Sequence, residues 1–381
     1  MEEISPLAEE RVVEFEKPEP QKRELTFKSF EFRGTGSEYF RIWIVNIALT
    51  ILTLGIYSAW AKVRTNRYFY ANTYLNGSNF EYNANPVRIL IGRIVVIAVY
   101  ALFILFSQEL AMFKVASGIA LVVFIAIPWL IRQAVSFKFR NTSYRHIPFR
   151  YTGKTSEFYA FFLLHSLYNI FTLFLIFPYS YIVFKRLLLN DAHYGNGKFK
   201  FEGGVGDTYA IYIQIFVWST LFLIAIVLLL GIIGGVGTAM FSSYLTPLFE
   251  SLKESLTPDI IAVITSVGVL LFYLPFIFWN KGFSDGYFSN FVRNKSSFHQ
   301  SPLKGDMKPF RLGVISATNL LAIVFSLGLL YPWAKVRYLK YKLEHTHFAC
   351  ENYNQFESDG YEQGSTVGEE MVDFFDIDIG L

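Results

Sequence analysis

The chain has little charge and almost no cysteine. Of its 381 residues 17% are charged and 53% are hydrophobic, whereas a soluble protein normally carries about a quarter charged residues. The single cysteine, Cys350, excludes an intrachain disulfide, a zinc ribbon and a CxxC redox motif. The sequence also lacks an HExxH motif and any pair of acidic residues deep in an apolar stretch. We therefore expect no enzymatic activity, no cofactor, no metal site and no nucleic-acid partner.

What the chain has instead is a series of apolar windows without Asp, Glu or Lys. Several of them reach the roughly 17–25 residues that a membrane-spanning helix needs. The windows are 42–61, 90–107, 115–131, 158–184, 209–249, 260–280 and 312–334. This pattern predicts the fold class: a membrane all-α protein, a polytopic helical bundle with about seven hydrophobic segments.

A five-residue string occurs twice and indicates an internal repeat. Trp60-Ala-Lys-Val-Arg64 returns as Trp333-Ala-Lys-Val-Arg337, at an offset of 273 residues. A second offset of 119 residues relates further positions, for example Arg67 and Arg186. The predicted organisation is a polar cytoplasmic segment 1–25, membrane repeats 26–148 and 149–308, a truncated repeat 309–350, and an acidic, disordered tail 351–381.

Short aromatic runs outside the apolar windows predict small cytoplasmic β-hairpin elements. Asn76-Gly77 separates two such runs, and this pair of residues favours the type I′ turn of a hairpin. Gly195-Asn196 has the corresponding place in the second repeat. Strands before and after window 42–61 can pair only if this window enters and leaves on one face of the membrane.

The distribution of basic residues favours the same path. If windows 42–61, 158–184 and 312–334 each return to the face from which they start, only Lys114 and Lys253 lie on the opposite side. Seven simple crossings would divide Lys and Arg almost evenly, against the tendency of basic residues to collect on the cytoplasmic face. We therefore favour three re-entrant segments with both termini in the cytoplasm. Seven crossings is the alternative that hydropathy alone gives.

The candidate site residues form two groups. Aromatic and basic residues at the ends of the windows could anchor the protein at the lipid head groups or form a basic pocket for an anionic lipid or substrate. This first group comprises Trp60, Lys62, Arg64, Arg67, Arg186, Trp333, Lys335, Arg337 and Lys340. Polar residues inside the windows could bond neighbouring helices or line a polar path. This second group comprises Asn46, Arg93, His165 and Asn319.

One family shares these strings. The run Leu-Thr-Leu-Gly55-Ile-Tyr, followed by Trp60-Ala-Lys-Val-Arg64 and Arg67-Tyr-Phe, resembles the YjgN family of bacterial inner-membrane proteins. The resemblance extends from about Thr26 to near the end of the third repeat, and Ala59 departs from the proline usual in that family. It implies a multi-pass protein of the bacterial inner membrane. Because the family is a domain of unknown function, it supplies no site residues.

Two functions stay open at this point. One is a transporter or channel-like protein with a polar path at the repeat interface and basic residues at its mouth. The other is a non-transporting scaffold that binds anionic lipid, a protein partner or a second copy of itself at the cytoplasmic face. Convergence of Asn46, Arg93, His165 and Asn319 on one cavity would favour transport, whereas their use in helix contacts would favour the scaffold.

Overall fold

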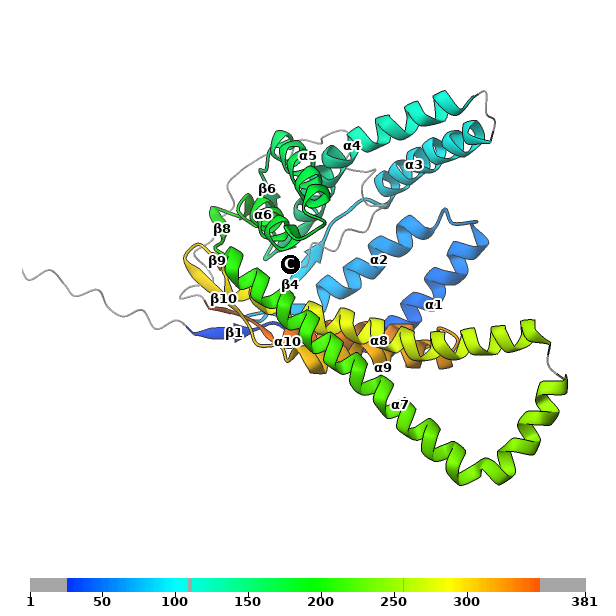
Figure 1. Cartoon of the computed structure of the whole chain (residues 1–381). Coiled ribbons are helices and arrows are strands. Elements are labelled where there is room, and N and C mark those ends of the chain that lie inside the picture. Colours follow the sequence, from blue (N-terminus) through cyan, green and yellow to red (C-terminus); the bar gives the residue numbers. More distant parts are fainter. Residues whose placement is uncertain (1–25, 109–111, 256, 350–381) are drawn as a thin grey trace, which may run out of the picture.

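Helices dominate the structure, and they come in pairs. The computed structural model describes residues 26–108, 112–255 and 257–349. In these residues the paired helices are α1 (Gly36–Leu52) with α2 (Ser58–Ala71), α3 (Pro86–Ser107) with α4 (Phe113–Arg140), α5 (Thr155–Phe171) with α6 (Phe177–Leu189), α7 (Val205–Ser255) with α8 (Pro258–Asn294), and α9 (Pro309–Phe325) with α10 (Tyr331–Glu344). All five helical hairpins extend from one sheet (Figure 1).

That sheet is antiparallel, and we call it the barrel. The described strands are β1 (Phe27–Ser29), β2 (Glu31–Phe32), β3 (Thr73–Leu75), β4 (Ser78–Tyr82), β5 (Thr142–Tyr144), β6 (Ile147–Tyr151), β7 (Ala192–Tyr194), β8 (Gly197–Phe201), β9 (Ser296–Phe298), β10 (Ser301–Gly305) and β11 (Thr346–Ala349). Their order is β1-β11-β10-β9-β8-β7-β6-β5-β4-β3-β2. The edge strands β1 and β2 are separated in the chain by Phe30 alone. The sheet therefore nearly closes on itself.

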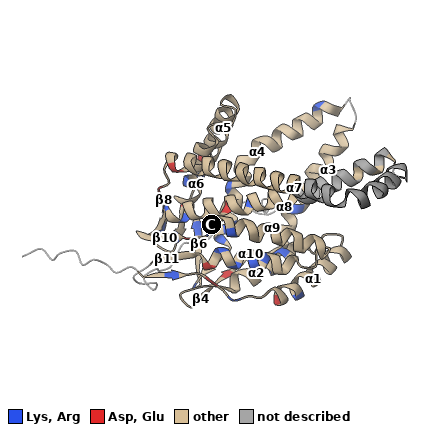
Figure 2. Cartoon of the chain, turned by 60° about the horizontal axis from the view of Figure 1, so that its bottom comes forward, with Lys and Arg blue, Asp and Glu red and all other residues tan. Residues whose placement is uncertain are grey.

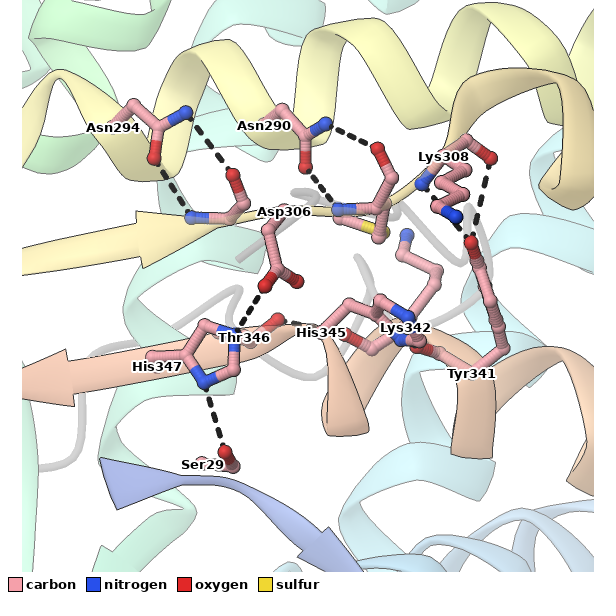
Figure 3. Close-up of polar contacts among 12 residues, drawn as sticks. Ser29, Asn290, Asn294, Asp306, Lys308, Tyr341, Lys342, His345, Thr346 and His347 are labelled. Atoms are coloured by element: carbon pink, nitrogen blue, oxygen red, sulfur yellow. Dashed lines mark hydrogen bonds and ion pairs between the residues drawn. The ribbon is translucent and has the colours of Figure 1, made fainter. Parts of the chain in front are cut away.

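Side chains of β1, β11 and α8 and of the segment after β10 hold the closing seam together (Figure 3). His347 of β11 contacts Ser29 of β1, with Nδ1 and Oγ 2.8 Å apart. Its Nε2 lies 3.1 Å from an Asp306 carboxylate oxygen just after β10. From α8, Asn290 Nδ2 donates to the Met307 carbonyl at 2.7 Å and Asn290 Oδ1 accepts from the Met307 N–H at 3.0 Å. The seam is thus fixed by side chains as well as by the strand ladder.

Aromatic and aliphatic side chains fill the inside of the barrel. Every second strand contributes one residue that is at most 7% exposed, namely Leu75, Tyr144, Tyr194, Phe298 and Phe348. A second set packs against the first: Phe30, Phe80, Phe149, Phe199 and Leu303, with Ile147 beside them. Neighbouring rings touch, as in the pair Phe199 and Phe298, whose centroids are 4.7 Å apart. Because these side chains are buried against one another, the described interior is a packed core rather than a pore.

The outer face of the barrel is polar. Successive residues of a strand point to opposite faces, so the neighbours of the core residues point outwards. Lys198 and Lys200 flank Phe199, Lys304 follows Leu303, and all three lysines are exposed. The outside of the barrel therefore suits an aqueous environment.

Some turns between the strands follow from local sequence. Asn76 and Gly77 join β3 to β4 with φ angles of 47° and 80°, the positive values that a type I′ turn requires. This confirms the hairpin predicted there, and the hairpin at Gly195 is confirmed by the pairing of β7 with β8. Arg145 and His146 form an equivalent turn, with φ angles of 49° and 63°. That turn was not predicted, because residues of these types seldom adopt positive φ.

The predicted fold class is wrong in its β part. The hairpins are not small separate elements of an all-α bundle, because they join into one eleven-stranded, nearly closed sheet. Each strand has only two to five residues, too few for a clear alternation in the sequence. The pairs that join one hairpin to the next, such as Phe80 with Tyr144, are distant in the chain and leave no local signal.

The predicted number of about seven membrane segments is also wrong. Among the described residues, three helical stretches are long and apolar enough to cross a membrane: Pro86–Ser107, Phe113–Arg140 and Val205–Leu229. Hydropathy overestimates the number because an average over a window does not distinguish one continuous helix from two short helices joined by an apolar turn.

Three of the predicted segments are such hairpins. Windows 42–61, 158–184 and 312–334 each contain a turn, and the helices on both sides of it lead back to the barrel. The strands before and after the first hairpin, β2 and β3, pair directly. The predicted polar segment 1–25 and the acidic tail 351–381 lie outside the described residues. The boundaries of the sequence repeats stay predictions.

The helices form a closed ring around the barrel end. Each helix packs against the next one in the chain, and α10 packs against α1.

The first helix starts with a capping box, in which Thr35 Oγ1 accepts from the Glu38 N–H and Glu38 Oε2 accepts from the Thr35 N–H, both at 3.2 Å. The Thr35 N–H and the Tyr68 hydroxyl lower the pKa of Glu38. The Glu38 carboxylate therefore stays charged to a lower pH than an ordinary glutamate, because its pKa is lowered.

Candidate functional site at the junction of helices and barrel

Part of the predicted basic group lies on the helix segments that lead into the barrel, which we call the junction. Arg67, Arg186 and Lys340 stand near the ends of α2, α6 and α10, and all three are exposed. In Figure 2 many Lys and Arg residues lie where helices meet the barrel, whereas the described outer parts of the helices carry few charges. Each of the three short hairpins thus presents an exposed cation at its base.

Two of these cations also connect one hairpin to the next. Arg67 Nε donates to the carbonyl of Tyr82 at 3.4 Å, and Arg186 Nη2 donates to the carbonyl of Gly203 at 2.9 Å. Both carbonyls belong to the segment that leads into the following helix. Lys340 instead pairs with Glu344, with Nζ and Oε1 3.8 Å apart. A guanidinium group has five N–H donors, so a bond to one carbonyl leaves donors for an anion.

Lys335 and Trp333 hold the last hairpin against the first. Lys335 Nζ lies 5.0 Å from the ring centroid of Phe69 and 5.8 Å from that of Tyr39, which are cation–π distances. Burial raises the pKa of Tyr39 to about 12, so this ring stays neutral beside the ammonium group. Trp333 covers Gly36, where an added Cβ would lie 2.3 Å from the indole ring. These two residues therefore serve packing.

The remaining members of the basic group have different surroundings. Arg337 Nη1 donates to Thr318 Oγ1 at 3.0 Å and to Asn319 Oδ1 at 3.3 Å. Arg64, its counterpart on α2, is exposed. Trp60 packs against a buried cluster of residues from α2, α3, α4 and the end of β4, and Lys62 is half-buried. The tryptophans of the two copies of the five-residue string thus contact different elements.

Asn46 and Asn319 make the same contact in two different hairpins. Asn46 Nδ2 donates to the carbonyl of Ala61 at 3.3 Å, and Asn319 Nδ2 donates to that of Ala334 at 2.8 Å. Each bond joins the two helices of one hairpin. The structure therefore uses both side chains for helix–helix bonding and does not bring them to a shared site.

The other two polar residues lie elsewhere. His165 of α5 stacks on Phe161, with ring centroids 4.5 Å apart. Arg93 of α3 donates from Nη1 to Ser58 Oγ of α2 at 2.5 Å, which ties the second hairpin to the first. Asn46, Arg93, His165 and Asn319 thus belong to four different hairpins, and each has a partner in its own or the adjacent one.

A cluster around Asp285 was not predicted from the sequence. Lys342 Nζ and the Tyr338 hydroxyl contact Asp285 Oδ2 at 2.9 and 2.5 Å, and Ser289 Oγ donates to Oδ1 at 3.0 Å. These contacts tie α8 to α10. One feature of the sequence could have indicated this cluster: Asp285 is the sole acidic residue from Ile260 to Asn294.

We expect Asp285→Asn to lower the free energy of unfolding by about 2 kcal/mol, because Lys342 would stay mostly buried without its counter-charge. Thermal unfolding in detergent measures the effect. Asp306→Asn is the matched control, since the Asp306 side chain is 49% exposed, and an exposed pair contributes about 1 kcal/mol or less. Equal stability of the two variants would contradict this role for Asp285.

Residues 27–374 match the family model described as bacterial protein of unknown function (DUF898). The chain belongs to this family. The match covers most of the chain, so the barrel and all five described hairpins of this DUF898 protein fall within it.

Relatives of the DUF898 chain carry the name inner membrane protein YjgN. The one from Escherichia coli O157:H7 is 37% identical over 111 residues, which are 28% of either chain. Those from Escherichia coli K12 and Salmonella typhimurium LT2 are 56% identical over 54 residues and 44% over 69, covering 14% and 18% of each chain. The matches thus span less than a third of these relatives. No solved structure matches the chain.

These findings confirm the resemblance to the YjgN family that the sequence indicated. The relatives are named inner-membrane proteins, and the three apolar helical stretches of the DUF898 chain agree with a membrane location. The number of crossings and the side on which the termini lie stay predictions.

One motif of the DUF898 chain has the spacing of a catalytic site but lies inside a helix. Gly282-Phe-Ser-Asp-Gly286 has the GxSxG spacing of a hydrolase nucleophile, which requires a sharp turn from strand to helix. Here it lies inside α8, and Ser284 Oγ is 3.5 Å from Asn280 Oδ1 one turn earlier. Both glycines pack against α9. The motif therefore serves helix packing.

Within the described ranges, no group of three His, Cys, Asp or Glu side chains could hold a metal ion.

Proposed function

We propose that this protein is a non-conducting membrane scaffold whose junction binds the head groups of anionic phospholipids. The observation that carries the proposal is the packed interior of the barrel. All five hairpins start at this sheet, and the core residues Tyr144, Tyr194, Phe298 and Phe348 are at most 7% exposed. A path enclosed by the hairpins would end on these side chains.

The polar residues of the hairpins support the same reading. A transport path needs polar groups that face a shared space, whereas Asn46 and Asn319 each bond the two helices of their own hairpin. These two side chains are therefore not available to line a transport path, which weakens the transporter-like alternative. The scaffold needs only contacts between the helices, and both side chains make such contacts.

The junction offers the charge that an anionic lipid requires. Arg64, Arg67 and Arg186 are exposed on helices whose outer parts are apolar, and basic residues at this level attract anionic head groups. The polar exterior of the barrel would then lie in water beside the same leaflet. The excess of Lys and Arg near the barrel favours the cytoplasmic side for it.

A lipid-binding comparison tests the proposal. The triple variant Arg64→Gln, Arg67→Gln and Arg186→Gln keeps hydrogen-bonding amides but removes three charges at the junction. We expect it to retain several-fold less phosphatidylglycerol than the wild-type protein in native mass spectrometry. The matched control removes three exposed charges from the barrel surface, through Lys198→Gln, Lys200→Gln and Lys304→Gln, and should retain the lipid. Equal losses in both variants would remove the junction as the binding site.

A flux measurement addresses the alternative. Proteoliposomes that contain the protein should leak small ions and metabolites no faster than empty liposomes. A protein-dependent flux would favour the transporter-like function and would contradict the non-conducting part of the proposal.

A further inference from the structure

The three short hairpins share one turn between their helices. In α1–α2 the Gly55 N–H donates to the Thr50 carbonyl at 2.8 Å. The same bond recurs in α5–α6, from Phe174 to Asn169 at 2.7 Å, and in α9–α10, from Gly328 to Ile323 at 2.7 Å. The residue before each of these donors has a positive φ. The turn is therefore one structure built three times, each time with leucine at this position of positive φ.

Polar groups in these turns are satisfied internally. The N–H groups of Leu54 and Ile56 donate to the carbonyls of Ile51 and Thr53, both at 3.1 Å. The Thr53 hydroxyl donates to the Leu49 carbonyl at 2.7 Å and accepts from a backbone N–H at 2.9 Å. A backbone whose N–H groups are bonded internally tolerates hydrocarbon, where water cannot supply partners.

The side chains at the tips are apolar and almost completely exposed. Leu54 is 96% exposed, Leu327 94% and Leu173 84%. No charged residue occurs from residue 42 to 61, from 158 to 184 or from 312 to 334. The tips thus contain nothing that requires water, and they need an apolar surrounding that the described chain does not provide.

The cations of α2 and α10 limit how deep the tips can reach. Lys62 and Lys335 lie four residues after the first residues of α2 and α10, Ser58 and Tyr331. Only about 6 Å of helix and the turn itself therefore separate these cations from the tips at Leu54 and Leu327. The hydrocarbon core is about 30 Å thick, so one leaflet contributes about 15 Å. If the tips emerged on the far side, Lys62, Arg64, Lys335 and Arg337 would lie within the hydrocarbon, which is costly for charged groups.

We infer that the three short hairpins are wedges in a single leaflet: their tips lie among the acyl chains of the leaflet next to the barrel and do not reach the opposite surface. This placement leaves the cations of α2 and α10 at head-group level and the apolar turns in hydrocarbon. The hairpin α3–α4 differs, because exposed Gln108 and Lys114 stand near its tip, where the far aqueous surface can solvate them. The inference does not depend on which lipid the junction binds.

Single cysteines test this placement. In full-length protein with Cys350→Ala, we would introduce Leu54→Cys, Leu173→Cys or Leu327→Cys and reconstitute each variant in liposomes. A membrane-impermeant maleimide should label none of the three from either side above the level of the cysteine-free protein. Gln108→Cys should be labelled from the side opposite the barrel, and Lys200→Cys from the barrel side, which shows that each preparation is folded and oriented.

A fluorophore attached before reconstitution reports the surroundings of the tips. At position 54, 173 or 327 it should be quenched by lipids that carry a spin label on the acyl chain. Labelling of these tips from the side opposite the barrel would overturn the inference. So would tips that are protected from water but not quenched by lipid, because another protein surface would then cover them.

Discussion

Gly282→Leu is expected to lower the free energy of unfolding by about 3 kcal/mol, because it forces α8 away from α9. A Cβ at Gly282 would lie 2.6 Å from the carbonyl oxygen of Leu312 and 2.7 Å from Cβ of Ser316. One turn later, a Cβ at Gly286 would lie 2.8 Å from Cα of Pro309. Two small residues spaced four apart thus bring the helix backbones into contact, as in membrane helix pairs. Leucine at this position has no space.

Gly231→Leu is the matched control for this prediction. Gly231 also lies within a helix, but a Cβ there would meet nothing within 4 Å, and replacing glycine should favour the helix by up to about 1 kcal/mol. Thermal or denaturant unfolding in detergent compares the two variants. If Gly282→Leu unfolds at the same midpoint as Gly231→Leu, the close contact of α8 with α9 does not stabilise the protein.

Phe298→Ala should lower the free energy of unfolding by about 4 kcal/mol, because it leaves a cavity in the barrel core. Phe298 is 4% exposed, and its ring contacts those of Phe199, Tyr194 and Phe348 at centroid distances of 4.7, 5.9 and 6.1 Å. The neighbouring rings come from strands on both sides of β9, so the loss weakens the barrel around the substituted residue.

The adjacent residue provides the control. Ser297 points to the outer face of the same strand, so Ser297→Ala removes one hydroxyl but no core volume, and a change within about 0.5 kcal/mol is expected. Phe298→Leu should give an intermediate loss, since it keeps part of the volume. If Phe298→Ala and Ser297→Ala unfold alike, the interior of the barrel is not packed as described.

The sequence predicted those features of the fold that depend on neighbouring residues. Asn76-Gly77 specifies its hairpin because glycine and asparagine tolerate the positive φ angles of the turn. The turn at Arg145 and His146 has nearly the same angles, but its residue types favour other conformations. The flanking strands, paired to their neighbours in the barrel, impose that turn from outside.

For the candidate site, the sequence located cations but not their partners. The offsets of 119 and 273 residues relate Arg67 to Arg186 and Lys340, and the structure places all three near the ends of equivalent helices. Which carbonyl Arg67 contacts, or which rings surround Lys335, depends on elements far away in the chain. The close contact of Gly282 with α9 could not be predicted for the same reason. A glycine in a helix does not by itself indicate which other helix packs against it.

By itself the amino-acid sequence determined the apolar helices, their basic ends, the family and the hairpin turns that carry Asn-Gly or Gly-Asn, because each follows from composition or from adjacent residues. Tertiary structure alone decided that the strands form one nearly closed barrel, whereas the distribution of Lys and Arg already favoured the return of three apolar windows to the face from which they start. The physical reason is that strands of two to five residues gain stability only when they pair with partners distant in the chain, such as Phe27 with Ala349. Such pairing leaves no mark in any short stretch of sequence.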